Sequence, residues 1–116
     1  MLRVNLKLSN NAGFERGLVF VHRTTGKGVD WSGITLCMQV RHKPDDAVPV
    51  FELSTENGGI VADPVTAGRL IFTITQAQTE KLTAPKYLHD LVQSCSGKTA
   101  MVWHGDIHVR EGITRQ

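Results

Sequence analysis

Alternation between apolar and polar residues is the feature that most limits what this chain can fold into. In residues 34–41 apolar side chains occupy every second position: Ile34, Leu36, Met38 and Val40. Successive side chains of a β-strand point to opposite faces, so this period of two predicts a strand with one buried face. Asp30, Ser32 and Gly33 stand just before it and are typical of a turn.

The same alternation recurs along the chain, between clusters of turn-forming residues. We expect strands over residues 2–8, 14–23, 34–43, 48–54, 60–62, 69–75, 86–93 and 99–110. Thr75 and Gln78 have the spacing of a capping box, which predicts one or two helical turns within residues 75–82. So short a helix is not stable alone, and we place it as a crossover at the sandwich end. Gly105 predicts a bulge or bend in the last strand.

These patterns predict an all-β fold, namely an immunoglobulin-like antiparallel β-sandwich of about seven to eight strands with one short helical crossover. With 116 residues, the chain is expected to form a single domain over residues 1–116. Residues 110–116 are polar and are expected to form a loose tail. The pattern leaves the order in which the strands pair open.

Composition and charge argue against several classes of partner. The chain has 13 basic and 11 acidic residues and a net charge of +2, without the basic stripe that nucleic-acid binding requires. It shows no signal peptide and no apolar run of membrane-spanning length, so we expect synthesis in a cytoplasm and no membrane partner. Cys37 and Cys95 form no CxxC pair, which argues against zinc and favours reduced thiols, although a disulfide between them stays open.

The best candidates for a metal site are His104, Asp106 and His108, which share one face of the last predicted strand. Alternate residues of a strand lie about 6.5–7 Å apart, so three ligands in a row would need a bend at Gly105. The alternative, which we favour, is that these residues form the solvent-facing side of an outer strand. We expect neither a metal nor another cofactor.

No catalytic motif stands out elsewhere. The chain has no G-x-S-x-G nucleophile elbow, and Cys37 lies inside a predicted strand. His89 and Asp90 are adjacent on a strand and point to opposite faces, so they cannot pair directly. If Asp90 is buried it needs a hydrogen-bond donor, for example Arg41. We therefore expect a protein that is not an enzyme.

Several apolar side chains are candidates for a protein interface. Trp31 lies in a predicted turn, where an exposed ring would anchor a protein contact; the alternative is a ring folded over the end of the sandwich. Val19 and Val21 form a second apolar face on their strand, and the first strand could pair with a neighbouring sheet. The interface candidates are Trp31, Val19, Val21, Leu2, Val4 and Leu6.

Four segments also carry a resemblance to a known class of protein. Residues 29–41 read V-D-W-S-G-I-T-L-C-M-Q-V-R and are similar to a V-D-L-[ST]-G-[YW]-T-x-x-M-Q-V-R run. The others are residues 51–60, residues 68–75 continuing to 82, and residues 87–91 with 97 and 104–110. This layout resembles small structural proteins of tailed-bacteriophage particles, especially immunoglobulin-like modules of tails and baseplates. Trp31 departs from it, because an aliphatic residue is usual there.

The resemblance implies a non-enzymatic structural component of a virion, made in the host cytoplasm. Such a protein would assemble through contacts at the tail, baseplate or head–tail region, with other virion proteins as partners and as a homo-oligomer in the particle. Two alternatives remain open. One is a monomeric β-sandwich binding module for a carbohydrate or surface ligand. The other, less favoured, is a metal-dependent enzyme that uses His104, Asp106 and His108.

Overall fold

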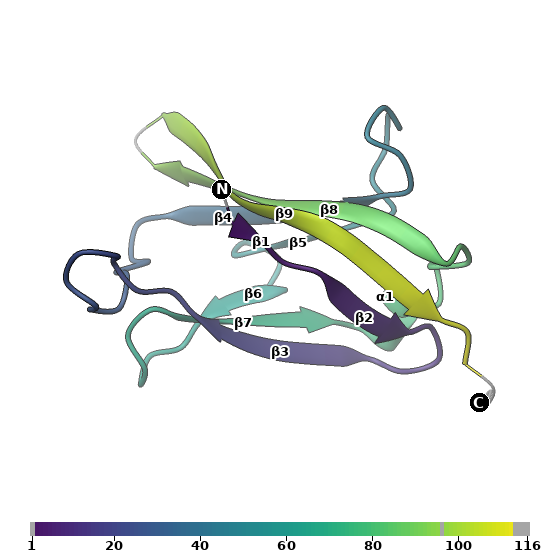
Figure 1. The fold of residues 1–116 in the computed structure, drawn as a ribbon, viewed down its shortest axis with the longest axis horizontal. Coiled ribbons are helices and arrows are strands. Elements are labelled where there is room, and N and C mark those ends of the chain that lie inside the picture. Colours follow the sequence, from purple (N-terminus) through teal and green to yellow (C-terminus); the bar gives the residue numbers. More distant parts are fainter. Residues whose placement is uncertain (1, 96, 113–116) are drawn as a thin grey trace.

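Two β-sheets pack face to face around one core in the computed structural model, which describes residues 2–95 and 97–112 (Figure 1). The larger sheet contains β1 (Leu2–Arg3), β2 (Leu6–Ser9), β4 (Thr35–Arg41), β5 (Phe51–Ser54), β8 (Lys86–Cys95) and β9 (Lys98–Arg110). The smaller sheet contains β3 (Phe14–Val19), β6 (Ile60–Ala62) and β7 (Arg69–Ile74). The prediction of an all-β sandwich with one short helix is confirmed.

The strand order explains how the two layers form. The larger sheet runs β1-β9-β8-β4-β5, with β2 also on β9, and the smaller runs β3-β7-β6. This arrangement corresponds to the G-F-C-C′ and B-E-D orders of immunoglobulin-like sandwiches. Pairing differs from the expected antiparallel arrangement at one edge, because β1 and β2 run parallel to β9. The predicted first strand is also split in two, at Val4 and Asn5.

The short helix α1 (Gln76–Thr79) begins with the predicted capping box. Thr75 Oγ1 accepts a hydrogen bond from the Gln78 amide at 3.2 Å, and Gln78 Oε1 accepts one from the Thr75 amide at 2.9 Å. At the end of the connection to β8, Tyr87 Oη accepts a hydrogen bond from the Ala84 amide at 3.0 Å. This bond resembles the tyrosine corner that fixes the same connection in immunoglobulin-like domains.

The core fills the space between the two inner faces. The fully buried large side chains come from both sheets and from the segment after α1; they include Leu36, Met38, Leu53, Leu70, Ile74, Leu82, Leu91, Trp103 and Ile107. Trp103 lies near its centre, with its ring centroid 4.9 Å from that of Phe72 in the opposite sheet. The period-two alternation therefore marks the core positions of β4 and β7 correctly. In β9 it holds for Trp103 and Ile107 but not for Met101, which has the same parity and is 46% exposed.

Gly105 does not form the bulge predicted for it. The register shift in β9 falls at Val102, between the pairs Leu91–Trp103 and Val92–Met101. Gly105 instead pairs regularly with His89 and allows the backbone of Val4 to pass close over it. A Cβ atom at position 105 would lie 1.8 Å from the Val4 carbonyl oxygen. The glycine is thus required by a contact between distant segments. Of the predicted tail, Arg110 ends β9, and residues 113–116 lie outside the described residues.

Candidate functional site

The outer face of the larger sheet carries a row of polar side chains. Cross-strand pairing places five of them next to one another, namely Glu52, Gln39, Asp90, His104 and Arg3. Gln39 Nε2 donates a hydrogen bond to Glu52 Oε2 at 3.1 Å, and Arg41 donates to the Gln39 side-chain oxygen. The Arg41 Nε atom donates to the Asp46 carbonyl at 3.1 Å, so the suggested bond from Arg41 to Asp90 is not formed.

The three candidate metal ligands lie on this outer face of β9, as the alternation predicts. Asp106 Oδ2 is already engaged by Arg3 Nη2 at 3.0 Å and by Lys86 Nζ at 3.6 Å. His108 has Lys7 and Lys86 as its cross-strand neighbours, and both would repel a cation. Within residues 2–95 and 97–112 no three His, Cys, Asp or Glu side chains come close enough to hold a metal ion. The strand places these ligands on one face without gathering them.

A shallow hollow of about 300 Å³ lies over the same face, beside Arg41, Asp90 and His104. Its lining mixes charges of both signs and contains no Phe, Tyr or Trp. Small-molecule sites are usually lined by apolar and aromatic side chains that exclude water. The hollow therefore provides polar contacts for a ligand but no Phe, Tyr or Trp ring to pack against it.

Cys37 lies half-buried on β4, and its thiol is free. Burial, followed by the neighbouring Glu52, Asp90 and Glu56 carboxylates, raises its pKa to about 11. A thiol with such a pKa stays protonated at neutral pH and is a poor nucleophile. The Cys95 side chain, the other partner of the disulfide left open by the sequence, lies outside the described residues.

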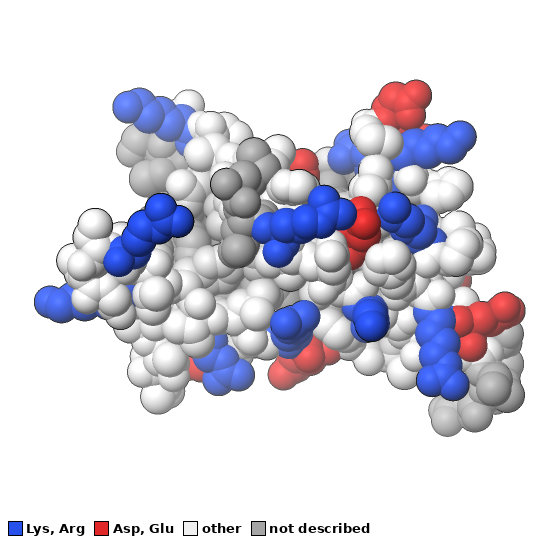
Figure 2. All heavy atoms as spheres, in the orientation of Figure 1, with Lys and Arg blue, Asp and Glu red and all other residues white. Residues whose placement is uncertain are grey.

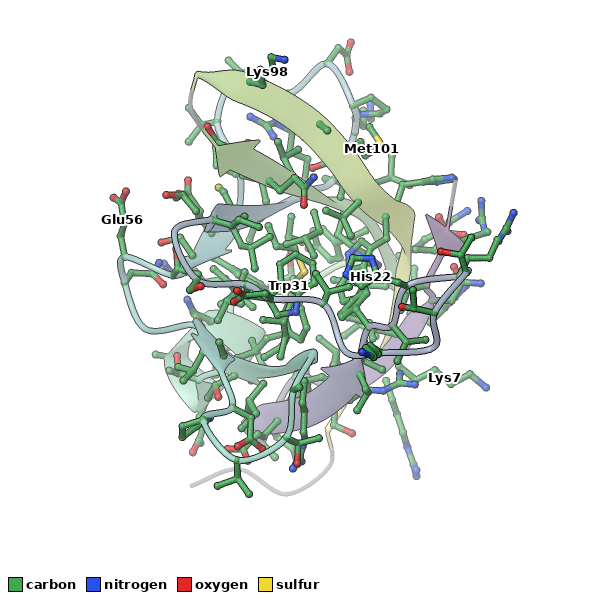
Figure 3. The ribbon with its side chains drawn as sticks, turned by 90° about the vertical axis from the view of Figure 1, so that its left-hand side faces the viewer. Lys7, His22, Trp31, Glu56, Lys98 and Met101 are labelled. Atoms are coloured by element: carbon green, nitrogen blue, oxygen red, sulfur yellow. The ribbon has the colours of Figure 1, made fainter. Side chains whose placement is uncertain are left out.

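Two of the predicted interface residues prove to be core residues. Trp31 is only 9% exposed; its Nε1 atom donates to the Gly68 carbonyl at 3.2 Å, and its ring meets Phe20 edge-on at 5.4 Å. It lies at the end of the sandwich that faces the viewer in Figure 3. Leu6 is buried because β2 completes the chain's own sheet. For Trp31 the structure matches the alternative, a ring folded over the end of the sandwich, and neither Trp31 nor Leu6 is exposed for a contact.

The other interface candidates differ in their exposure. Val19 and Val21 are 55% and 54% exposed, as an interface would require. Val4 is half-buried against the core, since its backbone follows β9. Leu2 pairs with Trp103 through its backbone, and its side chain lies outside the description.

An open groove of about 350 Å³ runs between the edges of the two sheets, and we call it the edge groove. One wall is formed by the β1–β2 connection and the other by β3. Its lining includes Arg3, Val4, Arg16, Leu18, Phe20 and, at the floor, Trp103. Figure 1 shows β2 and β3 along this side of the sandwich. The groove could not be predicted from the sequence, because its two walls belong to different sheets and form no strand pair with each other.

Comparison with known proteins adds no identification: no protein-family model matches the chain, and no curated protein matches it significantly. In the part of the chain that the structure describes, no helix is long and apolar enough to cross a membrane. What the protein does is therefore inferred from its surfaces and from the layout of its strands.

Proposed function

We propose that this protein is a non-enzymatic structural component of a tailed-bacteriophage particle and that it binds other virion proteins through its sheet edges. The observation that carries the binding role is the open edge groove beside β3. The phage setting is supported by the resemblance of residues 29–41 and the three other segments. In such a particle the protein would lie at the tail, baseplate or head–tail region and would be present in several copies.

The smaller sheet supports a binding role because its core is incompletely covered at β3. The side chains of Leu70, Phe72 and Ile74 on β7 are at most 3% exposed. Their partners on β3 face the same side of the sheet, yet Phe14 and Leu18 remain half-buried and Arg16 is exposed. A partner that covered this edge would remove further apolar surface from water, at about 25 cal/mol per Å².

Two nucleophile or base candidates are poorly placed for catalysis. The Cys37 thiol is held protonated by its raised pKa. The His89 ring is only 4% exposed and bonds the Val4 carbonyl, so a substrate has no access to it. These features favour a binding role over a reaction.

A second candidate function is a monomeric binding module, and the hollow on the outer face of the larger sheet favours it. Arg41, Asp90 and His104 could hold a polar ligand there. The absence of Phe, Tyr and Trp from that hollow argues against a carbohydrate, since sugars are commonly stacked on aromatic rings. We therefore place this function second.

Immunogold labelling tests the proposal on particles purified from cultures that produce this protein during infection. An antibody against the chain should label one position on intact particles, and purified protein added as competitor should abolish the label. Unlabelled particles, with the protein abundant and soluble in the same lysate, would contradict the particle role.

A further inference from the structure

We propose that the edge groove binds an extended acidic segment of a partner protein, which pairs with the free edge of β3 as an added strand. The segment would place a carboxylate against Arg16 and an apolar side chain over Phe20 and Trp103. This inference rests on the proposed binding function and specifies the chemistry of the partner.

The backbone of β3 provides the template for an added strand. Within the described residues, β3 pairs only with β7. The Phe20 amide donates to the Gly68 carbonyl at 2.8 Å, which directs its N–H toward the β7 side. Because successive peptide groups of a strand point to opposite sides, the N–H and C=O groups of Glu15, Gly17 and Val19 lie on the other, open edge. Such an edge can pair with an extended segment of another chain.

The side chains beside this edge provide an apolar floor. Leu18 and Phe20 line the groove and are half-buried, and Trp103 lies beneath them with its ring centroid 5.6 Å from that of Phe20. Every second side chain of an added strand would point toward this floor. An apolar side chain at one such position would complete the core where β3 leaves it open.

Arg16 determines the charge of the segment that fits. Its register with Phe72 places it on the core-facing side of β3, yet its side chain is exposed and has no hydrogen bond or ion pair within the described residues. An inward-pointing charge on an edge strand opposes pairing with most other strands, because burying it unpaired is costly. A carboxylate opposite Arg16 would accept a charge-assisted hydrogen bond from it, so that the guanidinium would no longer be buried unpaired.

The surroundings of the groove favour an acidic partner over a second copy of this chain. Arg3 lines the opposite wall, and Lys7 projects from β2 on the same side of the molecule (Figure 3). Figure 2 shows several Lys and Arg side chains on this side and fewer Asp and Glu side chains. If two copies paired through β3, their inward-facing residues Phe14, Arg16 and Leu18 would bring no acidic group to either arginine.

A peptide of twelve residues, in which threonine alternates with valine and glutamate in turn, provides the probe. Its valines and glutamates share one face of a strand, as the groove requires. We expect this peptide to bind the full chain by fluorescence anisotropy, and to shift the amide NMR signals of Glu15, Gly17 and Val19. Arg16→Glu should weaken binding of this peptide by about tenfold or more. The same variant should prefer a lysine version of the peptide, in which lysine replaces every glutamate. Arg23→Glu, the same charge change in an exposed loop, should leave binding unchanged.

A version of the peptide with N-methylated amides separates strand pairing from simple charge attraction, since it keeps every side chain but cannot donate to β3. Equal binding of the methylated peptide, equal binding of the lysine peptide, or no binding of the acidic peptide would overturn the inference.

Protection of the β3 amides that increases with protein concentration alone would also overturn it, because a second copy of the chain would then occupy the edge. If particles are labelled but the peptide fails, only this inference fails. If the peptide binds but particles are unlabelled, the particle role fails.

Discussion

The imidazole Nε2 of His89 lies 2.8 Å from the carbonyl oxygen of Val4, a residue 85 positions earlier in the chain. A carbonyl oxygen only accepts, so Nε2 carries the proton and donates. The ring is 4% exposed, and its Nδ1 atom has no hydrogen-bond partner within the described residues. Gly105 leaves the room for this contact. The bond therefore fastens the β1–β2 edge, one wall of the edge groove, to the core of the larger sheet.

Replacing His89 with leucine should release this edge. The Val4 carbonyl would lose its donor, and we expect the free energy of unfolding in urea to fall by about 1–2 kcal/mol. Amide hydrogen exchange should become faster in β1 and β2 and stay unchanged in β7. His108→Leu removes an exposed histidine from the same sheet and should change stability by less than about 0.5 kcal/mol. If His89→Leu accelerated amide exchange equally in both sheets, His89 would stabilise the whole fold and not the β1–β2 edge in particular.

Stability should fall on mild acidification because of the same histidine. Burial lowers the pKa of His89 below its ordinary value of 6.5, and this effect exceeds the opposing influence of the Val4 carbonyl, Asp90 and Asp106. The unfolded chain therefore binds more protons than the folded chain just below pH 6.5, so stability is full above that pH and decreases as pH falls toward the lowered value. The decrease is at most about 1.4 kcal/mol per pH unit for one group.

Urea denaturation between pH 7.5 and pH 5 measures this dependence. The hydrogen bonds to Asp30 and Asp63 lower the pKa of these carboxyls below 3.8, so their contribution is lost only at more acidic pH. The His89→Leu variant should show a flatter profile than the wild type between pH 6.5 and 5. Parallel profiles for the two proteins would show that His89 does not titrate as the structure implies.

Gly105→Ala should be strongly destabilising although it adds one methyl group. Its Cβ would lie 1.8 Å from the Val4 oxygen, so the β1–β2 edge would have to move and the bond from His89 would break. We expect a loss of about 1–3 kcal/mol. Gly13→Ala is the matched control, since its Cβ would lie 3.4 Å from the nearest atom, the Ile74 carbonyl oxygen. Equal stability of the two variants would contradict the close approach at Gly105.

Substitutions of Trp31 should act on stability and leave assembly contacts intact. Trp31→Ala removes a buried ring from the core and should cost about 3–5 kcal/mol. Trp31→Phe retains an aromatic ring and loses the hydrogen bond to the Gly68 carbonyl, with a smaller cost of about 1 kcal/mol. Thermal denaturation gives both values. If Trp31→Ala were as stable as the wild type but no longer entered particles, Trp31 would be an interface anchor and not a core residue.

The elements of this fold could be predicted from the sequence because their signals are local. Alternation over residues 34–41 and the Thr75–Gln78 capping box depend on neighbours a few positions apart, and both are confirmed. The role of Gly105 could not be predicted in the same way. It depends on Val4, about a hundred positions away, which reaches β9 only through the parallel pairing of the first strands.

The candidate site was less predictable than the fold. A turn position suggested an exposed Trp31, but the Gly68 carbonyl and the Phe20 ring that hold its side chain come from other parts of the chain. Arg16 lies on the core-facing side of β3 through its register with Phe72, and within the described residues no further strand pairs with that edge. Nothing in the local sequence indicates this open edge. The edge groove forms only where the two sheets meet, so the sequence pattern of a single strand does not predict it.

A cryo-EM structure of the assembled particle that resolves this protein tests the proposed binding at the β3 edge most directly. We predict an extended segment of another virion protein alongside residues 15–19, with a carboxylate at Arg16 and an apolar side chain over Phe20 and Trp103. A particle in which the β3 edge and the edge groove face solvent, while other surfaces of the protein make all of its contacts, would contradict binding at this edge.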